Sequence, residues 1–483
     1  MKKLLFYLMV MPAISLFTAC SEDHDEFDNS GITVFLTSAD LTSDGYFDGL
    51  MYYKVVSNSP QEVIINKTAK SAVTVDISEY ISINRSKYKC TGISKEAFQD
   101  CRNLTTVNIP SSITTIGEDV FLGCTALQKV NIKDLDAWCK IPFPNEYSNP
   151  LYYAGHLFLN GVEVTSLSIP NSVNKINNYA FIGCEGLTEL TIPNGVMKIG
   201  REAFSDCKSM TKVTIPSSVT EIGSLAFYNC DGLRKVQIED TDAWWKISFS
   251  DSESNPLYYA GHLYLNDSEV TELTIPNGIM EIGSYVIANC SSLTEVTIPN
   301  SVKSINRNAF SGCSNLKEVK IPNSVTSIGN GAFYNCSSLD TVAIGNGVTA
   351  IDDRAFQNCS SLKEMVIPNN VKNIGSQVFS YCSNLAKVNI GSGVKVIGYE
   401  VFADCSSLTD VTIGSAVEKI NDAFGRCSKL EFIHCQAVTP PSLNYDCFEP
   451  SIYNTATLYV PKEAIDAYKV DWVWNRFMNI EEE

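Results

Sequence analysis

Residues that catalysis and metal binding rely on are scarce in this chain. Only four histidines occur among 483 residues, and they are far apart in the sequence. The chain has no GxSxG or HExxH motif, no Walker motif, and no GxGxxG between a strand and a helix. Carboxylates are numerous but scattered, so no acid–base pair stands out. We therefore predict that the protein is not an enzyme and holds no metal or cofactor.

Positive charge is also scarce. The chain has 36 Lys and Arg against 54 Asp and Glu, a formal net charge of −18 at pH 7. Such a balance argues against binding nucleic acid or an anionic membrane through a basic surface. No apolar run after residue 20 is long enough to cross a bilayer. Hydrophobic residues still make up 45% of the chain, which is enough for a large core.

The N-terminus has the pattern of a targeting segment. A basic start is followed by the apolar run Leu4–Ala19 and then by Cys20. The residues Phe17-Thr-Ala-Cys20 resemble a bacterial lipobox, which implies cleavage before Cys20 and lipid attached to it. The acidic residues after Cys20 resemble the surface-export signal of some Gram-negative lipoproteins, or they form a solvated tether. A plain secreted protein with an unmodified Cys20 is the alternative.

We accordingly expect residues 1–19 to be a signal peptide and residues 20–45 to be the lipidated cysteine with an acidic tether. The mature protein is then anchored in the outer membrane by lipid alone, because several acyl chains hold a protein stably. We expect it to face the cell exterior. The sequence leaves open which leaflet of the outer membrane holds the anchor.

The rest of the chain repeats every 23 residues. Its unit reads LxxVxIPxxVxxIxxxAFxxC. The alternating V-x-I predicts a strand with one buried face, which the proline ends. The spacing of AFxxC fits one short helical turn. A unit of this size cannot bury six apolar side chains alone, so we predict coils stacked on one another.

This unit resembles the leucine-rich repeats, specifically the BspA type found in surface proteins of bacteria. The resemblance covers about residues 72–480. It implies an α/β repeat solenoid, a right-handed array with a parallel β-sheet along one face and short helical turns. We expect residues 46–100 to form an N-terminal cap and first coil, residues 101–435 the repeats, and residues 436–483 a C-terminal cap.

One cysteine occupies the same place in nearly every repeat. Equivalent cysteines on neighbouring coils point the same way, which suits the torsion of a disulfide poorly. We therefore predict a structural column of buried thiols. Cys435 and Cys447 lie off this register, and a disulfide is most expected there. The column consists of Cys101, Cys124, Cys184, Cys207, Cys230, Cys290, Cys313, Cys336, Cys359, Cys382, Cys405 and Cys427.

Two insertions, at about residues 133–164 and 239–270, enlarge single coils. They are copies of one another at an offset of 106 residues, and each is expected to contain a β-hairpin. Their aromatic residues either form the private core of the enlarged coil or lie exposed and bind sugar or protein. We expect the first for Trp138, Trp244 and the tyrosine pairs. Trp245 replaces a cysteine of the other copy, so we expect it to be more exposed and to contact a ligand.

The outward residues of the strands form a second candidate binding surface. This row either binds an extended partner by many weak contacts or simply holds threonines that favour strands. We expect a non-catalytic cell-surface lipoprotein that binds a host or microbial surface protein. The alternative is a glycan-binding lipoprotein that assists nutrient capture. The candidate residues of the row are Thr191, Thr214, Gln237, Thr274, Thr297, Lys320, Asn389 and Thr412.

Overall fold

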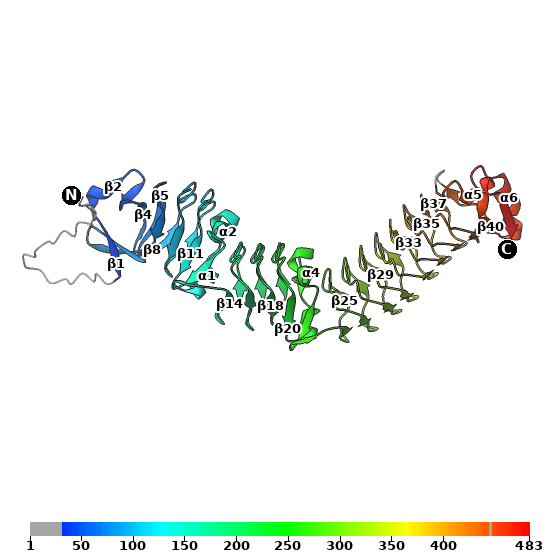
Figure 1. Cartoon of the computed structure of the whole chain (residues 1–483), viewed down its shortest axis with the longest axis horizontal. Coiled ribbons are helices and arrows are strands. Elements are labelled where there is room, and N and C mark those ends of the chain that lie inside the picture. Colours follow the sequence, from blue (N-terminus) through cyan, green and yellow to red (C-terminus); the bar gives the residue numbers. More distant parts are fainter. Residues whose placement is uncertain (1–30, 444–446) are drawn as a thin grey trace, which may run out of the picture.

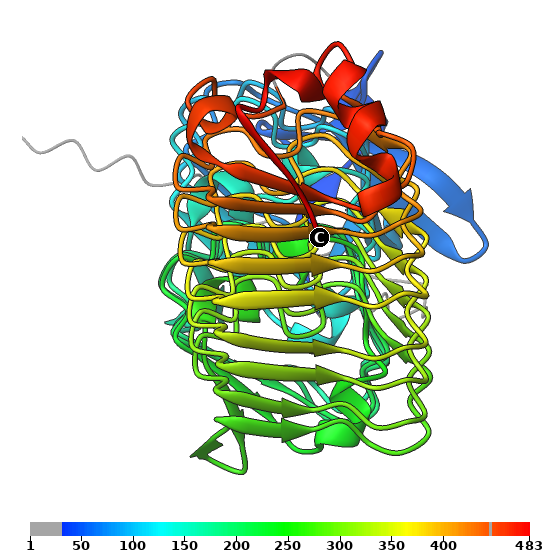
Figure 2. The ribbon, with the colours of Figure 1, turned by 90° about the vertical axis from the view of Figure 1, so that its right-hand side faces the viewer.

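The protein is a long, curved stack of coils, with one cap at each end (Figure 1). The computed structural model describes residues 31–443 and 447–483, so the expected signal peptide, Cys20 and residues 21–30 of the expected tether lie outside the described residues. Seen along the stack, the strands of successive coils lie one above the other (Figure 2). The repeat solenoid predicted from the 23-residue interval is confirmed.

The V-x-I segments form a row of parallel strands that we call the front sheet. Strands one coil apart pair in a constant register, for example Val319 with Val342. The row comprises β6 (Thr74–Asp76), β9 (Thr106–Ile109), β11 (Lys129–Ile132), β12 (Leu157–Leu159), β14 (Ser166–Ser168), β16 (Glu189–Thr191), β18 (Lys212–Ile215), β20 (Lys235–Ile238), β22 (Leu263–Leu265), β24 (Glu272–Thr274), β26 (Glu295–Thr297), β28 (Glu318–Ile321), β30 (Thr341–Ile344), β32 (Glu364–Ile367), β34 (Lys387–Ile390), β36 (Asp410–Ile413), β38 (Phe432–Cys435), β40 (Thr457–Val460) and β41 (Asn479–Glu482).

A second row of two-residue strands, which we call the back row, lies on the return segment of each coil. These strands also pair in parallel from coil to coil, as Ile305 does with Ile328. The row comprises β10 (Thr115–Ile116), β15 (Lys175–Ile176), β17 (Lys198–Ile199), β19 (Glu221–Ile222), β21 (Ser248–Phe249), β25 (Glu281–Ile282), β27 (Ser304–Ile305), β29 (Ser327–Ile328), β31 (Ala350–Ile351), β33 (Asn373–Ile374), β35 (Val396–Ile397), β37 (Lys419–Ile420) and β39 (Ser442–Leu443).

The AFxxC segment differs in detail from the short helical turn that its spacing favours. It forms successive tight turns, in which Cys313 N donates to Phe310 O at 3.2 Å, while Phe310 N donates to Ala332 O of the next coil at 2.8 Å. Asn308, with φ of 53°, lies in the left-handed region and interrupts any helical path. The backbone of this segment therefore bonds both within its own tight turns and to the neighbouring coil.

Each insertion closes an extra coil and then turns back on itself. In the first, β12 pairs in parallel with β11 and then forms an antiparallel hairpin with β13 (Val162–Glu163). Asn160 and Gly161 both have positive φ at the turn, as the hairpin prediction requires. The first insertion contains α1 (Leu135–Lys140), the 3-10 helix η2 (Glu146–Ser148) and α2 (Leu151–Ala154), and the second contains α3 (Thr241–Trp244), η3 (Ser252–Ser254), α4 (Leu257–Ala260) and β23 (Ser268–Glu269).

The N-terminal cap is a sheet in the order β1-β7-β8-β5-β4-β3-β2, and β10 of the first coil pairs with β8. It contains residues 32–45, which were expected within the tether. At the other end Tyr468 and Trp474 are fully buried and close the stack. The caps contain β1 (Ile32–Leu36), η1 (Ser38–Asp40), β2 (Leu41–Thr42), β3 (Gly45–Phe47), β4 (Met51–Asn58), β5 (Gln61–Thr68), β7 (Tyr80–Ile83), β8 (Ser86–Ile93), α5 (Ile452–Thr455), η4 (Lys462–Ala464), α6 (Ile465–Val470) and η5 (Trp474–Arg476).

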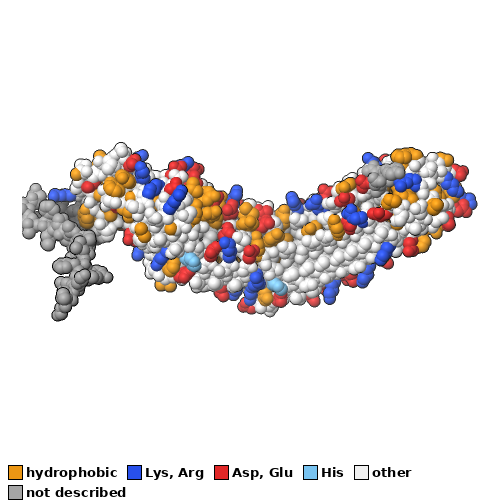
Figure 3. Space-filling view, turned by 45° about the horizontal axis from the view of Figure 1, so that its top comes forward, with side chains coloured by type: hydrophobic (Ala, Val, Ile, Leu, Met, Phe, Trp, Pro, Cys, Tyr) orange, Lys and Arg blue, Asp and Glu red, His pale blue; other side chains and the backbone are white. Residues whose placement is uncertain are grey.

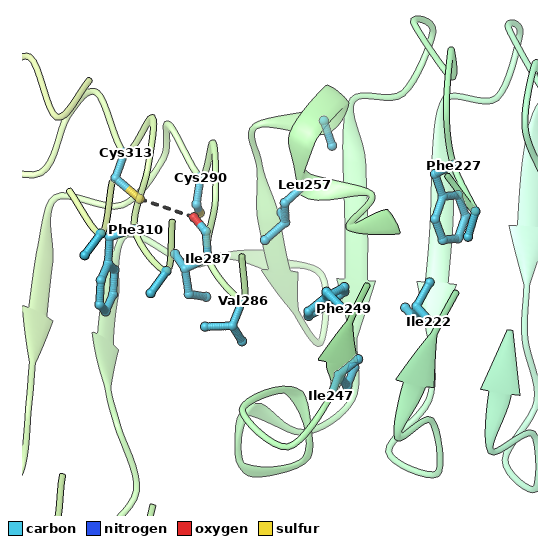
Figure 4. Packing of buried hydrophobic residues seen from close by; sticks show 14 of the residues in the cluster. Ile222, Phe227, Ile247, Phe249, Leu257, Val286, Ile287, Cys290, Phe310 and Cys313 are labelled. Carbon is cyan, nitrogen blue, oxygen red and sulfur yellow. Dashed lines mark hydrogen bonds between the residues drawn. The ribbon is translucent and has the colours of Figure 1, made fainter. Parts of the chain in front are cut away.

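The core is a set of columns that run along the stack. Stacked phenylalanine rings form one column, broken at each enlarged coil. In the second break Leu257 and Ile287 lie between Phe227 and Phe310 (Figure 4). The cysteines form a second column, and most of their Sγ atoms donate to a carbonyl of the preceding coil, as Cys313 does to Ile287 O at 3.3 Å. The rod thus has one continuous interior from cap to cap.

Candidate interaction surfaces

The front sheet presents most of its candidate row to solvent. Between the inward Val and Ile of each strand one side chain points outward, which follows from the two-residue period of a strand. Thr214 and Thr412 are half-buried. The exposed members are Thr191, Thr274, Thr297, Lys320 and Asn389.

Gln237 departs from the rest of this row. Its side chain is only 8% exposed. Its Nε2 donates to Ile238 O at 3.2 Å, and its Oε1 has no hydrogen-bond partner among the described residues. Gln237 pairs with Tyr264 on β22, the extra strand supplied by the second insertion. The expectation that Gln237 offers its amide to a ligand is therefore wrong.

The prediction that Trp245 is exposed is also wrong. Trp245 is 3% exposed and packs with its ring centroid 6.5 Å from that of Phe310, in a coil further along the chain. Its larger side chain fills the enlarged core at the place that Cys139 takes in the first copy. Its Nε1 has no hydrogen-bond partner among the described residues. Trp245 therefore cannot stack on a ligand from the outside.

The other insertion tryptophans belong to the core, as expected. Trp138 and Trp244 are almost fully buried. Trp138 Nε1 donates to Ala180 O at 2.9 Å, and Trp244 Nε1 donates to Val286 O at the same distance. Each indole thus ties its insertion to the next coil. Tyr152 and Tyr258 are 39% and 38% exposed, so the expectation that the tyrosine pairs belong to the core is wrong for these two rings, which are part of the surface.

A hollow interrupts the front sheet between β26 and β28. The two strands pair only at Glu295 and Glu318, whereas β28 and β30 pair along their length; the row has a further interruption between β30 and β32, which belong to different sheets. A cavity of about 310 Å³ opens beyond this pair, with Val296 and Ile298 among its lining. Thr297 and Lys320 line it as well, so the structure brings two of the candidate residues together. Neighbouring strands also place Thr191 beside Thr214, Thr274 beside Thr297, and Asn389 beside Thr412.

Acidic side chains gather beside this hollow. Glu272 pairs in register with Glu295, and Glu295 with Glu318, so three carboxylates follow one another up the sheet. Only Glu318 has an ion pair of these three within the described residues, to Lys320 at 2.8 Å. Like charges directly opposite one another destabilise a sheet. Elsewhere charged side chains gather along the rims of the stack and leave a broad face with few charges (Figure 3).

The thiols of the cysteine column have no reactive character. All sixteen described cysteines are buried and free, and this includes Cys435 and Cys447, where a disulfide was most expected. Burial raises the pKa of the Cys336 and Cys382 thiols to about 12, far from the range of a nucleophile at neutral pH. Tyr468 Oη donates to Cys435 Sγ at 3.1 Å and fixes that thiol in the C-terminal cap.

Three histidines lie in the described part of the chain, and each meets a glutamate. His156 Nδ1 lies 2.6 Å from Glu163 Oε1, and the second insertion repeats this contact between His262 and Glu269. Each pair joins the start of β12 or β22 to the hairpin strand that follows it. His434 stacks on Tyr459 at the C-terminal end. In the described ranges no three His, Cys, Asp or Glu gather as a metal site.

The fold and its surfaces define a leucine-rich-repeat solenoid. A family model described as a BspA type leucine rich repeat region (6 copies) matches residues 76–140, 154–254, 261–385 and 332–455. These matches cover most of the chain, and the protein belongs to the BspA-type leucine-rich-repeat family. No curated protein matches it. In residues 31–443 and 447–483, no helix is both long and apolar enough to span a membrane.

Solved structures share this fold. A leucine-rich repeat protein from Bacteroides ovatus ATCC 8483 is 25% identical, with a TM-score of 0.54 over 80% of this chain and 94% of that one. A leucine rich cell surface protein from Faecalibacterium prausnitzii A2-165 is 23% identical, with a TM-score of 0.45 over 77% and 94%. The pneumococcal vaccine antigen PcpA is 19% identical, with a TM-score of 0.44 over 90% and 97%.

Proposed function

We propose that this protein is a non-catalytic scaffold that binds another protein through its front sheet at the cell surface. The observation that supports the proposal is the constant register of the front sheet. Because of this register, an exposed side chain recurs at the same position on successive coils over much of the rod. Many weak contacts along such a surface add up for an extended partner. A regular outer face suits the binding of an extended partner. Catalysis instead needs reactive groups that converge in one place.

The partner segment that fits the hollow between β26 and β28 is basic. Glu272, Glu295 and Glu318 supply negative charge along the sheet, and the chain as a whole is acidic. A Lys or Arg of the partner can set its charged head against Glu295 while its aliphatic stem lies on Val296 and Ile298. Complementary charge of this kind speeds association and selects the partner.

Binding assays with single charge reversals test this proposal. The purified chain is immobilised and exposed to a panel of extracellular-matrix and microbial surface proteins. We expect at least one basic partner to bind, and Glu295→Lys to weaken that binding about tenfold or more. The matched control is Glu281→Lys on β25 of the back row, which is also exposed and leaves the front sheet unchanged. Equal loss in both variants, or no binding to any protein, contradicts the proposal.

The surface location is the second part of the proposal and rests on the lipobox-like residues that end in Cys20. We expect the chain to be labelled with radioactive palmitate in growing cells and to be cleaved by protease added to intact cells. A Cys20→Ser variant provides the control and is expected to lose the label. Full protection from the protease in intact cells contradicts an outward orientation.

A further inference from the structure

The blocks that contain the two insertions are copies of one another, and they have diverged at several places, one of which lies on the surface beside α2 and α4. Residues 148–157 are identical to residues 254–263, yet the coils that face them have diverged. On the coils that follow the insertion, the first copy has three charged side chains at this place and the second has none, whereas the residue just before the identical segment is a tyrosine in the first copy and a glutamate in the second. Where the first copy has Tyr147, Gly183, Glu185, Asp206 and Lys208, the second has Glu253, Asn289, Ser291, Gly312 and Ser314.

A cavity of about 300 Å³ occupies this place in the first copy. It lies between α2 and the turns around Cys184 and Cys207 of the next two coils. Tyr152 and Tyr153 line it from α2, and Glu185, Asp206 and Lys208 line it from the turns. This volume suits one or two rings of a small polar ligand.

Gly183 leaves room for the cavity. A Cβ at Gly183, where φ is +71°, would lie 2.9 Å from Leu151 O and 3.1 Å from the Cα of Tyr152. The second copy carries Asn289 at this place with φ of 61°, and its Nδ2 donates to Tyr258 O at 3.2 Å. The fold therefore accepts an asparagine here, and its side chain occupies the space beside the helix.

The aromatic wall is held in a fixed orientation. The ring of Tyr152 stands edge-on to both Tyr147 and Tyr153, with centroids 5.2 and 5.1 Å away. The hydroxyl of Tyr153 accepts a hydrogen bond from Gly123 N at 3.1 Å. Because its neighbours are anchored, Tyr152 offers a ring that loses little conformational freedom when a ligand packs against it.

The opposite wall is polar. Lys208 Nζ lies 2.7 Å from Glu185 Oε1, and this contact raises the pKa of Lys208 and keeps it charged. Asp206 Oδ1 accepts from Asn229 Nδ2 at 2.5 Å. Two carboxylates and one ammonium leave the cavity with a net negative charge. Such a lining disfavours lipids, because it is largely polar, and disfavours phosphate or other anions, because of its charge.

We propose that this cavity, which we call the α2 pocket, binds a neutral saccharide unit. A sugar ring has an apolar C–H face that packs on an aromatic ring such as Tyr152. Its hydroxyl groups donate to the carboxylates of Glu185 and Asp206 and accept from Lys208. The source of the unit is either a free monosaccharide or the terminal residue of a glycan. The α2 pocket lies apart from the hollow between β26 and β28, so it adds a second kind of ligand to the proposed protein binding.

The test measures sugar binding by the purified full chain. Galactose, mannose and N-acetylglucosamine are titrated with detection by saturation-transfer NMR, and a printed array supplies neutral and sialylated oligosaccharides. We expect a neutral sugar to bind, and Tyr152→Ala to weaken binding at least tenfold. The matched control Tyr258→Ala changes the equivalent ring of the second copy and is expected to have no effect. Binding of free monosaccharides identifies that source, and binding on the array alone identifies a glycan end.

Two further variants copy the second insertion into the first. Gly183→Asn is expected to abolish binding by filling the α2 pocket. Because an added Cβ at Gly183 lies close to the backbone of α2, the double variant Glu185→Ser with Lys208→Ser serves as a second test and is also expected to abolish binding. Glu295→Lys is expected to leave sugar binding intact, which separates this proposal from the proposed protein binding. No sugar binding, a preference for sialylated glycans, or equal loss in Tyr258→Ala overturns the proposal.

Discussion

Phe310 and Phe333 lie one coil apart with their ring centroids 5.2 Å from each other and their planes inclined by only 3°. The same arrangement recurs from Phe333 to Phe356 and onward to Phe448. Each ring in the middle of this column has a neighbour on both faces. From Phe310 to Phe448 the same ring contact therefore holds each coil to the next, and we expect the stability of this part of the rod to depend on it.

Removing one ring from the middle of the column is expected to weaken the rod strongly. Phe333→Ala deletes contacts on both faces and leaves a cavity, so we expect a loss of about 3–5 kcal/mol in the free energy of unfolding. Urea unfolding followed by circular dichroism measures this loss. The control Met197→Ala changes a side chain that is 52% exposed, and we expect a change of less than about 0.5 kcal/mol. Similar losses in the two variants would show that the column does not carry the stability.

The cysteine thiols are expected to be unreactive until the protein unfolds. They are buried, and burial raises the pKa of Cys124 and Cys427 to about 12. In native protein we expect none of the sixteen described cysteines to react with a thiol reagent within minutes. In denaturant without reductant, all sixteen should react. A mass shift that shows a bond between Cys435 and Cys447 would contradict the free thiols of the C-terminal cap.

Alkaline pH is expected to destabilise the fold. The pKa of Cys336 and Cys382 is about 12 in the folded protein against an ordinary value of 9.0, which the unfolded chain approaches. Below pH 9 both states hold the proton, and the full stability is present. Between pH 9 and 12 only the unfolded state loses the proton, so the free energy of unfolding falls by about 1.4 kcal/mol per pH unit for each such thiol.

Urea titrations at pH 8, 9.5 and 10.5 measure this slope. Buried tyrosines add to it, since burial also raises the pKa of Tyr259 to about 12. The double variant Cys336→Ala with Cys382→Ala isolates the contribution of the thiols, because it removes two titrating groups and leaves the tyrosines. We expect a shallower decline with pH in that variant. An unchanged slope would mean that these thiols ionise equally in the folded and unfolded states.

The sequence predicts the repeating parts of this molecule well because their signal is local and periodic. The V-x-I alternation has the period of a strand, and recurrence of one apolar pattern every 23 residues indicates which coil packs on which. The sequence pattern cannot distinguish a helical turn from the tight turns at AFxxC, because both place Ala309, Phe310 and Cys313 on the inside. The back row also escapes prediction, since strands of two residues, such as Ser304–Ile305, have no measurable period.

The surfaces are harder to predict because they depend on contacts between coils. Trp245 is buried against Phe310, far along the chain, and its difference from Cys139 suggested the opposite. The α2 pocket joins side chains of one helix and two later coils. The identities between the duplicated blocks reveal the duplication, but the sequence signal of the pocket is the set of differences between these blocks, among them Gly183 against Asn289.

The central claim is that each 23-residue unit is one interchangeable coil of a continuous rod. Deleting residues 337–359 tests it most directly, because the new junction joins Cys336 to Ser360 and restores the same local sequence. We predict a folded protein with one coil fewer, about 4.8 Å shorter along the stack by X-ray scattering or crystallography, in which Phe333 stacks on Phe379. A deletion of residues 337–348, half a unit, should not fold. An unfolded protein after the full-unit deletion, or equal tolerance of both deletions, would contradict the account.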